Sequence, residues 1–158
     1  MVAGGHRHKE VPSYATYSSV VAQDSVRIIF MLAALNGLKV KTANIGNAYL
    51  NAPNKERVHV KCGPEVFGPE GEGRIAIIDR ALYGLKSAGN AWRYSFSNYI
   101  TEELKYCSTV ANPDVYHKPM IKEDGSKYYA YLVVYVDDVL CCDVDPFINI
   151  DQIQPTFR

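Results

Sequence analysis

The sequence predicts an α+β fold in which helices pack on one face of an antiparallel sheet. Two segments, residues 19–37 and 90–106, repeat apolar side chains at helical spacing. Within residues 114–144, apolar runs alternate with turn residues, which is typical of consecutive antiparallel strands. Strands that follow one another without a helix between them favour an α+β layer fold over a parallel sheet.

The first helix is expected within residues 19–37, where Asn36-Gly37 supplies a stop signal. Ser18 or Ser19 is expected to cap its first turn. Near-helical spacing predicts a buried face made of Val21, Ile28, Leu32 and Leu35.

Three short strands and one loop are expected next. Residues 38–45 alternate apolar and polar side chains, and residues 57–61 and 74–79 are short runs of the same kind. Residues 63–73, rich in Gly, Pro and Glu, are expected to form a loop.

A second helix is expected over residues 90–106, with Trp92 in its core. Residues 127–136 and 139–144 are expected to pair as strands on either side of Asp137-Asp138. A last helix is expected over residues 146–157, broken by Pro155.

The composition suits one globular, soluble domain. The chain has 158 residues, 47% of them hydrophobic and 22% charged, with no net charge. No apolar run is long enough to cross a bilayer, and the amino terminus resembles no signal peptide, so an intracellular, cytoplasmic location is the default expectation. Four cysteines without CxxC spacing are expected to be reduced structural thiols.

The segment LVVYVDDVLCC, residues 132–142, places two adjacent carboxylates between strongly apolar runs. Strand interiors disfavour Asp, so Asp137-Asp138 marks a hairpin turn. Two interpretations of that turn remain open. The acids either serve the turn alone or hold metal ions at a strand tip. A metal-dependent hydrolase that also uses Asp143 is a further alternative.

Five motifs occur in order along the chain: MVAGGH, TYSSVVAQDSVRIIFMLAALNGL, NIGNAYLNAP, RALYGLKSAGNAW and YVDDVL. Together they resemble the reverse transcriptase of copia-type retrotransposons, which is part of a pol polyprotein. The resemblance covers about residues 1–145. It implies an antiparallel palm-type sheet and a partial fingers–palm of a right-hand polymerase over residues 1–158, truncated before the thumb and the RNase H domain.

The resemblance also implies partners and a location. The partners are an RNA or DNA primer–template, dNTPs and the remaining polyprotein segments, without a membrane, and the family works inside virus-like particles. The implied reaction is RNA-directed DNA polymerisation by two Mg²⁺ ions, which activate the attacking oxygen and stabilise the leaving one. Mg²⁺ prefers carboxylate ligands.

By the resemblance, Asp137 bridges the two metal ions and Asp138 is the more peripheral acid. A third catalytic carboxylate belongs at position 44, where this chain has Asn44. Because Asn44 ends one expected strand and Asp137-Asp138 join two others, position 44 is expected to lie beside the acidic pair. At an effective dielectric of about 20, one charge about 4 Å from another contributes roughly 4 kcal/mol, and a dication doubles this. Each 1.36 kcal/mol of transition-state stabilisation is about tenfold in rate. We therefore expect little or no polymerase activity, which leaves a non-catalytic nucleic-acid-binding remnant or an inert retroelement fragment as alternatives.

The remaining implied roles concern the nucleotide. The backbone carbonyl of Ile45 is expected to face a metal ion, and Tyr49 is expected to exclude a 2′-hydroxyl, or else to be a core tyrosine. Lys86 is a candidate phosphate contact, or else a solvated lysine. Val136 resembles the variable residue that faces the primer terminus. The implied nucleotide-binding set is Ile45, Gly46, Asn47, Ala48, Tyr49 and Lys86.

Overall fold

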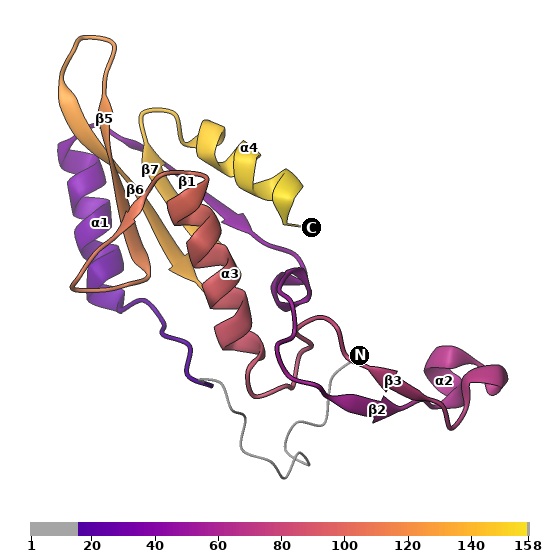
Figure 1. The fold of residues 1–158 in the computed structure, drawn as a ribbon. Coiled ribbons are helices and arrows are strands. Elements are labelled where there is room, and N and C mark those ends of the chain that lie inside the picture. The colour runs from indigo at the N-terminus through magenta and orange to yellow at the C-terminus, as the bar shows by residue number, and fades with distance from the viewer. Residues whose placement is uncertain (1–15, 158) are drawn as a thin grey trace. The chain divides into compact units, whose positions relative to one another are not determined.

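A computed structural model describes residues 16–157, which form two compact units (Figure 1). The ribbon unit contains Tyr49–Trp92 with residues 16–17, and the sheet unit contains Ser18–Ala48 with residues 93–157. The motif at residues 1–6 lies outside the described residues. That residues 1–158 form one partial domain stays a prediction.

The sheet unit is built on one five-stranded antiparallel sheet with the strand order β1-β7-β6-β5-β4. Four consecutive strands form a meander, and the earlier β1 pairs with β7 at one edge. The antiparallel sheet expected from the sequence is confirmed. The strands are β1 (Lys39–Asn44), β4 (Cys107–Ser108), β5 (Val115–Ile121), β6 (Lys127–Tyr135) and β7 (Asp138–Asp143).

Helix α1 (Gln23–Leu35) forms where the sequence predicts it and ends at Asn36, followed by Gly37 with φ 63°. The expected serine cap is wrong, because the cap position is Ala22 and makes no side-chain cap bond. The expected buried face is also displaced. Ile29 and Ala33 are the buried residues of the helix, whereas the predicted Ile28 and Leu35 are exposed.

Helices cover both faces of the sheet, so the expectation of helices on one face only is wrong (Figure 1). Helix α1 lies over the face that carries Val133 and Leu140. On the other face, α4 (Pro146–Thr156) buries Ile150 and Ile153, and the ring centroid of its exposed Phe147 lies 3.6 Å from the Lys41 Nζ atom of β1. The reason is visible in β7, where Cys141 and Cys142 point to opposite faces and both are buried.

Helix α3 (Ala88–Glu102) carries the aromatic core expected from the sequence, and Trp92, Phe96 and Ile100 are buried. The sequence predicted that Pro155 would break the last helix. Pro155 instead lies inside α4, in its last turn. The helix ends at the next residue, so the missing proline N–H costs at most one terminal hydrogen bond. None of the helices in residues 16–157 combines the length and apolar character needed to cross a bilayer.

The ribbon unit contains a two-stranded antiparallel ribbon, β2 (His59–Lys61) with β3 (Ile75–Ile77). A 3₁₀ helix at Ala48–Asn51 begins at the junction between the two units. The segment expected to be a loop, residues 63–73, instead holds a short helix, α2 (Pro64–Phe67), and a 3₁₀ turn at Pro69–Gly71. A proline begins each of these turns, which suits its fixed φ.

Candidate active site

The acidic pair lies at the tip of the hairpin that joins β6 to β7. Tyr135 and Asp138 are cross-strand partners, so Val136 and Asp137 alone form the turn. Val136 has φ 57°, the left-handed region that a β-branched residue rarely adopts. The pairing of β6 with β7 holds this strained turn in place, and Val134 and Val139 on either side of the turn are buried.

Strand β1 brings position 44 to the acidic pair. Asn44 is the register partner of Asp138, and its Nδ2 atom donates a hydrogen bond of 3.3 Å to Asp138 Oδ1. The backbone N–H of Ile45 donates to the carbonyl oxygen of Asp137 at 2.8 Å. The proximity expected from the sequence is confirmed, whereas the catalytic roles of these residues stay predictions.

The donor set at this tip does not fit the two-magnesium site of the resemblance. Asp138 is exposed and Asp137 is half-buried, so both carboxylates are accessible. The third side chain is a neutral amide that presents its N–H, and not its oxygen, to Asp138. Within residues 16–157, no three His, Cys, Asp or Glu side chains are placed to hold a metal ion together.

A cavity of about 790 Å³ opens beside Asp138, between α1 and the sheet. Its walls are mostly apolar, with Phe30 and Val133 among them, and Arg27 is a cationic group at its lining. Arg27 pairs with Asp24 at 3.2 Å, so the space beside the acidic tip suits a mostly apolar ligand.

The hydrolase alternative with Asp143 as a third acid is wrong. Asp143 is at the other end of β7, five residues from Asp138, which corresponds to about 17 Å along a strand. It is buried and accepts hydrogen bonds from Tyr128 Oη at 2.6 Å and Asn149 Nδ2 at 2.9 Å. These partners make Asp143 a structural group that ties α4 to the sheet.

The cysteines of β7 are also structural, as the sequence predicts. All four cysteines of the chain are free thiols. Burial raises the pKa of the Cys141 thiol to about 12 and that of Cys142 to about 11. Because only a thiolate is a good nucleophile or metal ligand, neither residue takes part in chemistry near neutral pH.

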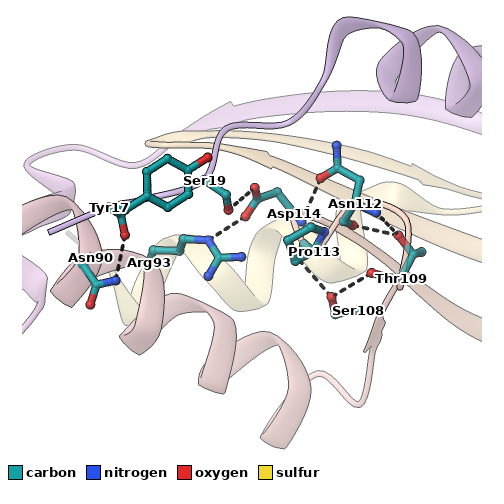
Figure 2. Close-up of polar contacts among 9 residues, drawn as sticks. All are labelled: Tyr17, Ser19, Asn90, Arg93, Ser108, Thr109, Asn112, Pro113 and Asp114. Carbon is teal, nitrogen blue, oxygen red and sulfur yellow. Dashed lines mark hydrogen bonds and ion pairs between the residues drawn. The ribbon is translucent and has the colours of Figure 1, made fainter. Parts of the chain in front are cut away.

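Sequence reasoning missed a buried ionic cluster that supports β6. Asp114 accepts hydrogen bonds from Ser19 Oγ at 2.5 Å and from Arg93 Nε at 2.8 Å (Figure 2). Its own backbone oxygen accepts from Val134 N at 2.9 Å, two residues before the acidic hairpin turn. Three distant segments therefore meet at the buried carboxylate of Asp114. In the sequence, the one sign of this cluster is a single Asp directly before an apolar strand.

The nucleotide-binding residues predicted from the resemblance divide between the two units. Ile45 and Ala48 are buried in the sheet unit, and Asn47 has φ 50°. In the ribbon unit, Tyr49 stacks on Tyr83 with ring centroids 4.5 Å apart. Gly46 and Lys86 are exposed, the first in the sheet unit and the second in the ribbon unit. Their nucleotide contacts stay predictions.

Comparison with known proteins gives a consistent result. Residues 1–154 match the profile of the family described as reverse transcriptase (RNA-dependent DNA polymerase). The chain is 27% identical over 147 residues to the retrovirus-related Pol polyprotein from transposon RE1 of Arabidopsis thaliana, covering 92% of this chain and 10% of that protein. It is 29% identical over 146 residues to the retrovirus-related Pol polyprotein from transposon TNT 1-94 of Nicotiana tabacum, again covering 92% of this chain and 10% of that protein.

The chain thus spans about a tenth of the length of the curated relatives it matches. No solved structure gives a significant match to it. The family match extends over nearly the whole sequence, and the relatives are Pol polyproteins of copia-type transposons. The chain therefore belongs to the reverse transcriptase (RNA-dependent DNA polymerase) family.

Proposed function

We propose that this chain carries the nucleotidyl-transfer site of a reverse transcriptase and that this copy of the site is inactive or nearly so. In this proposal the partners are an RNA or DNA primer–template and dNTPs. The observation that carries the proposal is the pairing of Asn44 with Asp138 at the strand tip. This pairing supports the presence of the site, because it brings position 44 to the acidic tip. It also supports the loss of activity, because position 44 is an amide and not a carboxylate.

The residues of the sheet unit have separate roles in this proposal. Asp137 and Asp138 supply the two remaining carboxylates for Mg²⁺, and the Ile45 carbonyl supplies a neutral oxygen. Because Asn44 adds no negative charge, Mg²⁺ binds more weakly here than at a site with three carboxylates.

Primer extension with Mg²⁺ tests the proposal. The chain and its Asn44→Asp variant are assayed alone and fused to the following segments of an active relative. We expect no extension by either wild-type form and recovered extension by the fused variant. Extension by the wild-type chain at rates typical of the family would contradict the loss of activity. Failure of the fused variant, with its fold intact by circular dichroism, would contradict the intact remainder of the site.

A second candidate function is nucleic-acid binding without catalysis. The observation that favours it is the hydrogen bond of Asn44 to Asp138, which gives one of the two acids a partner without a metal ion. A binding titration on primer–template at several salt concentrations tests it, because phosphate contacts release counterions and produce a steep salt dependence. An absence of binding would leave an inert fragment as the remaining interpretation.

A further inference from the structure

We propose that the outward face of the β2–β3 ribbon holds a single-stranded nucleic acid. His59 and Lys61 are alternate residues of β2 and share a face, and Arg57, two residues before the strand, continues the same alternation of exposed and buried side chains. On β3, Ile77 is the cross-strand partner of His59, and Ile75 is the partner of Lys61. A row of basic side chains therefore runs directly beside a row of apolar ones.

Both rows are open to solvent. The side chains of Arg57, His59 and Lys61 are exposed. The exposed fraction of Ile75 is 73% and that of Ile77 is 55%. The other face of the ribbon is the one that packs, because Val60 and Ala76 are half-buried. The two isoleucines contribute little to the core, so an occupant of the outward face would bury apolar surface that folding leaves exposed.

The basic row is also free of acidic partners. Across residues 16–157, neither Arg57, His59 nor Lys61 forms an ion pair. Asp79, two residues beyond Ile77, lies 3.8 Å from Arg80 instead. The acidic side chains Glu65, Glu70 and Glu72 lie in the connection between β2 and β3. The charges of the row are thus available to an external anion.

The pattern fits a single strand of nucleic acid better than other occupants. Alternate residues on a strand are about 7 Å apart, which is comparable to the spacing of successive phosphates along an extended nucleic-acid chain. Cations along this line neutralise phosphates, while the isoleucines pack against base faces, which a duplex hides in its stack. A second copy of the same face would bring two basic rows together, and like charges directly opposite one another are destabilising. The inference rests on the proposed function, because the strand would be the nucleic acid of that reaction.

Binding of labelled oligouridylate and oligothymidylate to the full chain, measured by fluorescence anisotropy, tests this surface. We expect Arg57→Gln/Lys61→Gln to weaken binding about three- to tenfold and to reduce the salt slope by about 1.4. We expect Ile75→Thr/Ile77→Thr to weaken binding to a similar extent, about three- to tenfold, with an unchanged salt slope. Threonine keeps the β-branched shape that suits a strand.

The matched control is Lys105→Gln/Lys127→Gln, which removes the same charge from exposed sites of the sheet unit. It is expected to leave affinity within about twofold and the salt slope lowered by less than about 0.5. Equal losses in the control and the ribbon variants would overturn the proposal, and so would an absence of binding by the wild-type chain. A change in oligomeric state alone, seen by light scattering, would assign the face to self-association. Primer extension by the fused Asn44→Asp variant reports separately on the proposed function.

Discussion

The Asn44→Asp substitution is expected to lower the stability of the metal-free protein. The Nδ2 atom of Asn44 lies 3.3 Å from Asp138 Oδ1. A carboxylate oxygen in that place would put two like charges at this distance, which costs about 1.3 kcal/mol in water and about 5 kcal/mol at a dielectric of about 20. Both side chains are exposed, so the lower figure applies. Loss of the hydrogen bond adds about 1 kcal/mol, and the expected destabilisation is about 2 kcal/mol.

Thermal unfolding followed by circular dichroism measures this effect. For a chain of this length, 2 kcal/mol corresponds to a decrease in Tm of about 4–8 °C. Mg²⁺ should reverse the decrease in the variant, because a ligand at a concentration of about 100 times its Kd adds about 2.7 kcal/mol of stability. Wild-type protein, with one carboxylate fewer, should respond much less to Mg²⁺.

The control for this experiment is Asn44→Asp/Asp138→Asn, which exchanges the two side chains. It keeps the net charge and reverses the direction of the hydrogen bond, so we expect a Tm near that of the wild type and a weak response to Mg²⁺. If the Asn44→Asp variant had the Tm of the wild type when EDTA removes all metal ions, the reasoning would be refuted. So would a response to Mg²⁺ of equal size in the single variant and the exchanged control.

Further outcomes follow from the supporting structure. Val136→Gly should raise the free energy of unfolding by about 1 kcal/mol in urea titration, because glycine adopts positive φ without strain; a lower value would indicate that the turn is not strained. Asp114→Ala should lower it by about 3 kcal/mol, because the buried carboxylate pairs with Arg93, whereas the exposed ion pair of Asp24 should contribute under about 0.5 kcal/mol in Asp24→Ala; equal effects would contradict this. The contribution of Cys141, Cys142 and Tyr128 to the free energy of unfolding should be constant below about pH 9 and fall as pH rises from about 9 to 12, since the folded state holds protons that the unfolded state releases; a flat profile over that alkaline range would show that these three groups are not buried. Burial raises the pKa of Cys142 to about 11 and the pKa of Cys141 and Tyr128 to about 12.

Local patterns predicted the elements well and the tertiary relations unevenly. The hairpin around Asp137 and the extent of α1 follow from turn residues and periodicity, which act over a few positions. The buried face of α1 is displaced by one residue, to Ile29 and Ala33, and Val21, counted as part of that face, is buried but precedes the helix. The Asp114 cluster joins residues up to 95 positions apart, and no local pattern reports such a contact.

The proximity of Asn44 to the acidic tip was expected because Asn44 ends one predicted strand and Asp137-Asp138 join two others, and the resemblance supported it, although spacing alone does not pair β1 with β7. The pairing itself explains how the fold tolerates the asparagine. Three carboxylates at one strand tip repel one another in the metal-free state, whereas the amide replaces one repulsion with a hydrogen bond to Asp138. A substitution that weakens the proposed chemistry therefore stabilises the scaffold, which is the usual relation between a functional site and the stability of the fold that holds it. The strand pairing that holds the strained turn at Val136 and the buried carboxylate of Asp114 keep the geometry of the site even where one of its charges is gone.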